Sequence, residues 1–146
     1  MSLNKIFTII FVSLVFATAA YANQAKFITP AFDKVNTGTD PKHTPVIQAP
    51  EKVQSGEWFD VTVTIGKEGV HPSFEEHHVE WIALFKNDVE LSRIYLHPVH
   101  SQPKVTFTIA LKDSATLKVM TAPNHTSAWV GSKKIKVMKS DGKRSS

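Results

Sequence analysis

The fold class of this chain follows from one stretch of alternating residues, Trp58-Phe59-Asp60-Val61-Thr62-Val63-Thr64-Ile65. From Phe59 to Ile65 every second side chain is apolar, and the side chains between them are aspartate or threonine. Successive side chains of a β-strand point to opposite faces, so this alternation predicts a strand with one buried and one polar face. The same alternation returns at residues 105–111.

Further strands are predicted at residues 78–85, 90–96, 116–121 and 133–138, with Gly, Pro, Asn and Asp turns between them. No window has the 3.6-residue period of an amphipathic helix. Together these patterns predict an all-β fold, an immunoglobulin-like antiparallel β-sandwich of about seven strands. Trp58, Trp81 and Trp129 are expected to lie in the core or in the wall of a site.

Four segments are predicted along the chain. Residues 1–22 have the form of a secretory signal peptide, with an apolar run that ends in Ala20-Tyr21-Ala22 and cleavage expected before Asn23. A retained membrane anchor is the alternative. Residues 23–50 are expected to form an extended Pro-rich leader, residues 51–138 the sandwich, and residues 139–146 a basic flexible tail. The mature protein is therefore expected to be periplasmic or otherwise secreted, without a membrane contact.

The basic residues are concentrated near the C-terminus. From Lys133 onward there are six basic residues and one acid, whereas the rest of the predicted mature chain has ten basic and twelve acidic residues. This distribution predicts a solvated tail, with a weak docking patch for an anionic partner as the alternative. No nucleic-acid motif is present, so no nucleic-acid partner is expected. The chain has no cysteine, which excludes disulfides and thiolate metal ligands.

The seven histidines fall mainly in loop-like sequence. His43 lies in the Pro-rich leader, His71 follows a glycine turn, and His77 and His78 open a predicted strand. Adjacent side chains of a strand point to opposite faces, so only one of that pair can face the same ion as His71. Neutral imidazole is the commonest side-chain metal ligand. The pattern predicts a partly open metal site built from several loops at one end of the sandwich.

Three segments, residues 42–47, 66–72 and 76–82, resemble superoxide reductase, the iron-binding domain of neelaredoxin and desulfoferrodoxin. The resemblance runs with gaps from about residue 42 to residue 137. It implies a mononuclear non-haem iron, with another divalent transition metal as a substitute for that iron. It also implies superoxide as the small-molecule partner and an electron donor of unknown identity. A homo-oligomer is compatible with it.

The resemblance implies a role for particular residues. It places metal ligands at His43, His71 and His77, and it makes Lys42 the lysine that attracts the superoxide anion. His78 is expected to face away from the metal. His97 and His100, which flank Pro98, are expected to face solvent, although they are available as substitute ligands.

The chain departs from the family pattern at the remaining ligands. The family has a cysteine-asparagine-x-histidine-glycine loop followed by a tryptophan. Aligned on Asn124 and Trp129, the cysteine becomes Pro123 and the histidine becomes Thr126. His125, one position early, is the candidate fourth ligand through a rearranged loop. The family's glutamate, two residues before the first histidine, corresponds to Pro41, with Asp40 next to it.

Two functions follow from this comparison of motifs. The first is an exported superoxide-reductase-like oxidoreductase, which reduces superoxide to hydrogen peroxide at a histidine-ligated iron. The alternative is a non-catalytic periplasmic metal-binding or redox accessory protein on the same scaffold. The missing cysteine favours the alternative, because a soft anionic ligand tunes the redox potential of iron. The segment from His71 to Ile82, together with Lys42, favours the enzyme.

Overall fold

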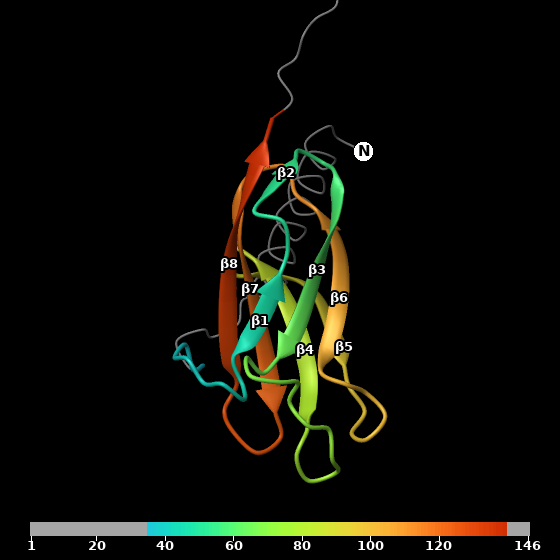
Figure 1. The fold of residues 1–146 in the computed structure, drawn as a ribbon. Coiled ribbons are helices and arrows are strands. Elements are labelled where there is room, and N and C mark those ends of the chain that lie inside the picture. The colour runs from blue at the N-terminus through green and yellow to red at the C-terminus, as the bar shows by residue number, and fades with distance from the viewer. Residues whose placement is uncertain (1–34, 140–146) are drawn as a thin grey trace, which may run out of the picture. The chain divides into compact units, whose positions relative to one another are not determined.

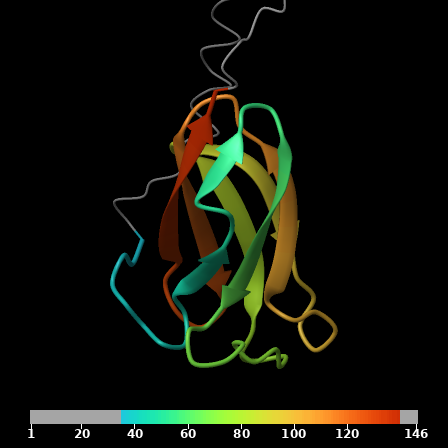
Figure 2. The same ribbon diagram turned by 45° about the horizontal axis from the view of Figure 1, so that its top comes forward.

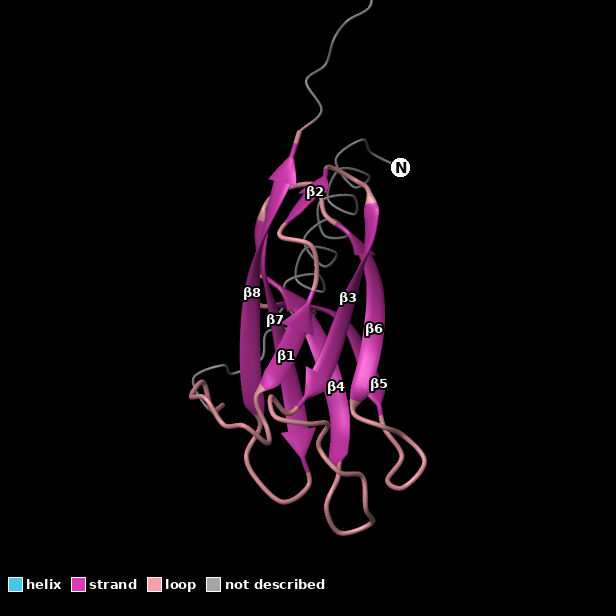
Figure 3. Cartoon of the chain, viewed as in Figure 1, coloured by secondary structure: helices cyan, strands magenta, loops and turns pink. Residues whose placement is uncertain are grey.

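The computed structural model describes residues 35–139, and within them every regular element is a strand (Figure 3). The predicted signal peptide, the first part of the leader and nearly all of the basic tail lie outside the described residues. No helix in the described part of the chain could span a membrane. The strands are β1 (Pro45–Gln48), β2 (Lys52–Gln54), β3 (Trp58–Ile65), β4 (Val79–Lys86), β5 (Val89–Tyr95), β6 (Lys104–Ala110), β7 (Ala115–Pro123) and β8 (Trp129–Met138).

The strands form two sheets, a three-stranded sheet of order β1-β3-β6 and a five-stranded sheet of order β2-β8-β7-β4-β5 (Figure 1). The all-β prediction is confirmed. Two short strands, β1 and β2, lie where no strand was predicted, and β1 falls inside the stretch expected to be an extended leader. The β2–β8 pair is parallel, so the sandwich is not purely antiparallel as predicted. Both short strands carry too few residues to show a period, and they form by pairing with β3 and β8.

The core lies between the two sheets, and the alternation of β3 supplies one side of it. Phe59 is 8% exposed, and Val61, Val63 and Ile65 are fully buried. The facing layer consists of inward side chains of β4, β7 and β8, namely Ile82, Leu84, Leu117, Val119 and Ile135. Each such side chain stabilises the fold by about 1.5–3 kcal/mol on burial. The prediction that Trp58 lies in the core or in a site wall is wrong. Its side chain is 72% exposed and belongs to neither.

The register of the strands brings four connecting segments to one end of the sandwich. Pro45, at the start of β1, pairs with Ile65 at the end of β3. Val79, at the start of β4, pairs with Pro123 at the end of β7, and Trp129 at the start of β8 pairs with Thr121. Residues 35–44 and the β3–β4 and β7–β8 loops therefore meet at this end, with the β5–β6 loop beside them (Figures 1 and 2).

Contacts with β8 hold the segment before β1 against the sandwich. Asn36 donates from its backbone N–H to the carbonyl of Ala128, and it accepts from the N–H of Val130. Further along, β1 passes so close to β8 that a Cβ on Gly131 would lie 2.6 Å from the Pro45 carbonyl oxygen. Only glycine permits this approach. The segment that carries His43 is therefore anchored on the strand that follows His125.

Candidate metal centre

His43 is held by a tight turn that begins at Asp40. The Asp40 N–H donates to the Thr44 hydroxyl at 2.7 Å, and the Thr44 N–H returns a bond to the Asp40 carbonyl. The Asp40 carboxylate accepts from the backbone N–H groups of Lys42 and His43 at 2.7 and 3.0 Å. These bonds, the Lys42 N–H foremost, hold the pKa of the Asp40 carboxyl below its ordinary value.

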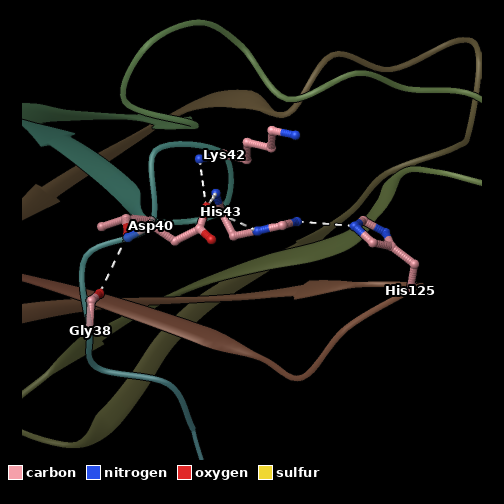
Figure 4. A network of polar contacts seen from close by, with 6 residues as sticks. Gly38, Asp40, Lys42, His43 and His125 are labelled. Atoms are coloured by element: carbon pink, nitrogen blue, oxygen red, sulfur yellow. Dashed lines mark hydrogen bonds and ion pairs between the residues drawn. The ribbon is translucent and has the colours of Figure 1, made fainter.

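The same carboxylate fixes the tautomer of His43. The Asp40 Oδ1 lies 3.2 Å from Nδ1 of His43, which donates its proton to it (Figure 4). In the neutral ring this leaves a lone pair on Nε2, at the far side of the imidazole from the aspartate. A carboxylate behind a ligating histidine orients the ring and raises its basicity.

His71 lies at the end of a turn that leaves β3. Gly66, with φ of 99°, opens the turn, and the His71 N–H closes it onto the Ile65 carbonyl at 2.7 Å. The side chain is 3% exposed, and its Nδ1 donates to the Pro72 carbonyl at 2.8 Å. Nε2 is buried and has no hydrogen-bond partner among the described residues. A buried orphan nitrogen costs free energy unless something binds it.

His125 lies in the β7–β8 loop. Its Nδ1 is 3.1 Å from Oδ1 of Asn124, and that oxygen also accepts from the His78 backbone N–H at 3.0 Å. A backbone N–H can only donate, so the amide oxygen and not the amide nitrogen faces both groups. His125 therefore donates from Nδ1, and its Nε2 carries the lone pair. That Nε2 lies 3.0 Å from Nε2 of His43.

The three histidines converge on one point. One nitrogen of each of His43, His71 and His125 lies within 4.8 Å of the others. Their ring centroids are 5.2, 5.2 and 5.4 Å apart. With metal–nitrogen bonds of about 2.1 Å, two imidazoles at a tetrahedral angle on one ion have centroids about 5.2 Å apart. Three lone pairs that face one another repel unless a cation lies between them, so these residues fit a divalent transition metal.

Desolvation and the neighbouring histidines favour the metal-binding form of two of these rings. Burial is the first cause that lowers the pKa of His71 below the ordinary histidine value, and the charges of His77, His43 and His125 lower it further. The pKa of His125 is lowered in the same way, by burial and then by the neighbouring histidines. A lowered pKa favours the neutral imidazole, which is the ligand form.

His77 lies against the other rings but outside the set of converging nitrogens. Its centroid is 3.8 Å from that of His125 and 4.8 Å from that of His71, and both pairs are stacked. The structure thus brings the four predicted ligands together, with three nitrogens converging and the fourth ring packed on two of them. His78 donates from Nδ1 to the Phe74 carbonyl instead, and His97 and His100 are exposed, as expected.

A cleft of about 540 Å³ opens beside His71 and His77. Its walls are mostly apolar, with Val70, Pro72 and Phe74 among them, and Lys42 lines its rim with an exposed side chain. The exposed Glu68 also lines the cleft, so one positive and one negative charge face it, and the Lys42 ammonium is the charge that attracts small anions. The cleft admits a small molecule to one side of the histidine cluster.

Sequence reasoning missed two residues that organise this centre. It assigned no role to Asp40 or to the Asn124 amide, although an aspartate three residues before a histidine and an asparagine next to one are signals for such bonds. Trp129, expected in the core or a site wall, stacks on His43 with centroids 5.7 Å apart and an interplanar angle of 15°. Its Nε1 is buried without a partner among residues 35–139. Trp129 therefore forms a wall of the centre.

Comparison with known proteins relates the chain to one family. The desulfoferrodoxin profile matches residues 35–132. Neelaredoxin of Megalodesulfovibrio gigas is 30% identical over 112 residues, which cover 64% of this chain and 86% of that protein. Superoxide reductase of Pyrococcus horikoshii is 46% identical over 44 residues, 30% of this chain and 36% of that protein. The solved superoxide reductase (neelaredoxin) of Ignicoccus hospitalis superimposes with a TM-score of 0.62 at 38% identity, covering 66% of this chain and 81% of that one.

Proposed function

The chain belongs to the desulfoferrodoxin family, and from this premise we propose that it is an exported, mononuclear iron protein that reduces superoxide to hydrogen peroxide. One observation carries the proposal. In a chain of this family, His43, His71 and His125 each commit Nδ1 to an oxygen acceptor, so that their Nε2 atoms are left for one ion. Export is proposed from the signal-peptide pattern of residues 1–22.

Iron, when bound, supplies the one-electron redox change that converts superoxide and two protons into hydrogen peroxide, after which an external one-electron donor restores it. The three converging imidazoles of His43, His71 and His125 would hold the iron. His77 remains a predicted ligand, and its stacked ring keeps the rings of His71 and His125 in place. Asp40 keeps His43 in the tautomer that presents Nε2.

The surroundings of the cluster suit a small anion. Lys42 places a positive charge at the rim of the cleft, which raises the rate at which superoxide arrives. Among the converging imidazoles, His71 is shielded from water, at 3% exposure, and electrostatic interactions are stronger where water is excluded. Trp129 closes the side of His43 that it stacks against.

A second function is favoured by a specific feature, the absence of cysteine from all 146 residues. Pro123, which corresponds to the family's cysteine, is buried at the end of β7 and offers no donor. A site with imidazoles only carries more positive charge than one with a thiolate, so ferrous iron is harder to oxidise. The second candidate is therefore a non-catalytic metal-binding or redox accessory protein on the same scaffold.

Rapid mixing of the iron-loaded mature protein with superoxide separates the two functions. The enzyme consumes one superoxide for each reduced iron and releases no dioxygen, whereas the accessory protein leaves the spontaneous decay of superoxide unchanged. Lys42→Ala should slow the reaction and weaken its dependence on ionic strength, because the steering charge is gone. The matched control is Lys104→Ala, because Lys104 is an exposed lysine at the start of β6. Decay at the spontaneous rate by protein with a full complement of iron would refute the enzymatic proposal.

A further inference from the structure

The β5–β6 loop carries two histidines that the metal centre does not use. His97 and His100 are both exposed, and their ring centroids lie 5.1 Å apart at an interplanar angle of 44°. This separation is nearly that between the rings of the three converging histidines, 5.2–5.4 Å. It is also the separation of about 5.2 Å that two imidazoles on one tetrahedral ion require.

The backbone of the loop is strained at Val99, one of the two residues between His97 and His100. Val99 has φ of 68°, a left-handed conformation that is a genuine outlier for a β-branched residue. Such strain costs about 1–3 kcal/mol and persists only where the surroundings over-determine it. Here the Val99 N–H donates to the Ser73 carbonyl at 3.1 Å, and the His100 N–H donates to the Pro98 carbonyl at 2.8 Å.

Further hydrogen bonds close the loop around the pair. Ser101 donates from its N–H to the His97 carbonyl, and its hydroxyl accepts from the His97 N–H at 3.2 Å. These contacts hold residues 97–101 in one conformation that keeps the two imidazoles on neighbouring positions. Because the loop is ordered before any ligand arrives, binding to the pair loses little conformational entropy.

The tautomer of His97 leaves a free ligand nitrogen. Its Nδ1 donates to the Pro98 carbonyl at 2.6 Å, which leaves the lone pair on Nε2 in the neutral ring. No hydrogen bond of the His100 ring is found within residues 35–139. Both rings can therefore donate nitrogen to an ion, and imidazole pairs suit copper, nickel and zinc better than the hard cations magnesium and calcium.

We propose that His97 and His100 form a second metal site, which binds one divalent late-transition ion through two imidazoles and completes its coordination with water. This second site shares no ligand with the three-histidine centre. It is adjacent to that centre in the fold, because Val99 bonds to Ser73 in the β3–β4 loop, which also carries His71 (Figure 1).

Titration of the metal-free mature protein with Zn²⁺, read by equilibrium dialysis and calorimetry, counts the sites. The wild type should bind two equivalents and the His97→Gln/His100→Gln variant one. His78→Gln, which removes a histidine whose Nδ1 bonds to a backbone carbonyl, should still bind two. His71→Ala should remove the equivalent that binds at the three-histidine centre and keep the one at His97 and His100. The two variants therefore distinguish loss of one site from loss of the other. One equivalent in the wild type that His71→Ala abolishes, or two in the double variant, would overturn the proposal.

A measurement without substitutions guards against a variant that fails to fold. Cu²⁺ added beyond the first equivalent should broaden the amide signals of His97, Val99, His100, Ser101 and Ser73 in nuclear magnetic resonance spectra. Signals of the distant β2–β8 pair should stay sharp. Broadening spread evenly over the chain, or confined to the three-histidine centre, would contradict the second site.

Discussion

His43 and His125 bring their Nε2 atoms within 3.0 Å of each other although 82 positions separate them in the sequence. The contact depends on three strand pairings, β1 with β3, β4 with β7, and β7 with β8, which bring their loops to one end. Each of the two rings points its N–H away from the contact, to Asp40 or to Asn124. Two facing lone pairs at this distance repel unless a proton or a metal cation lies between them, and the nearby Nε2 of His71 makes the pair fit a metal ion.

His71→Ala should abolish binding of metal at the three-histidine centre. It removes the buried nitrogen that has no other partner and leaves two exposed or half-buried imidazoles. Metal analysis after reconstitution with Fe²⁺ under anaerobic conditions measures the loss. His78→Ala serves as the control and should bind iron as the wild type does. Full iron content in His71→Ala, with an unchanged far-ultraviolet spectrum, would mean that the ion binds elsewhere.

Asp40→Asn should weaken metal affinity about tenfold, at the low end of the effect of removing a carboxylate behind a ligating histidine. The amide oxygen can still accept from Nδ1 of His43, but the negative charge that raises the basicity of the ring is lost. Competition with a coloured chelator measures the affinity. Asp60→Asn is a matched control, because Asp60 is exposed on β3 and accepts from the Thr108 hydroxyl. Equal affinities of the two variants would show that Asp40 shapes the turn only.

The stability of the metal-free protein should fall in mild acid. The pKa of His71 is lowered by burial, so below the ordinary value of about 6.5 the unfolded chain binds a proton that the folded chain does not. The contribution of neutral His71 to the free energy of unfolding is complete above the pKa of this histidine in the unfolded chain. It is lost as the pH falls through the pKa of His71 in the folded protein. Denaturant unfolding between about pH 7 and about pH 5 measures it. His71→Gln should show a shallower decline, and an identical decline in both proteins would refute this origin.

Gly131→Ala should destabilise the fold by about 1–3 kcal/mol, as overpacked positions do. The added Cβ would lie 2.6 Å from the Pro45 carbonyl oxygen, so β1 would have to move away from β8. Thermal unfolding measures the loss. At Gly38 an added Cβ meets nothing within 4 Å, and Gly38→Ala should leave the melting temperature nearly unchanged. The same melting temperature for both variants would show that β1 yields without cost.

Much of the scaffold could be predicted from local patterns. The alternation of Trp58–Ile65 placed β3 at its observed bounds, and five further strands were predicted within a few residues of where they lie. The short strands β1 and β2 were missed because they exist through pairing with distant segments. Trp58 was misplaced for a related reason. It begins β3 on the solvent side, and an aromatic residue by itself does not indicate which face it occupies.

The all-β fold, the histidines as candidate ligands and the lack of a thiolate follow from residue types and from a period of two, so the sequence alone predicts them. The three-dimensional arrangement of the loops groups His125 with His43 and His71 and stacks His77 beside them. It also decided which nitrogen of each ring is free, because Asp40, Pro72 and Asn124 take the Nδ1 protons. The physical reason is that a lone pair's direction follows from strand register and loop hydrogen bonds, and neither is encoded in the spacing of the histidines.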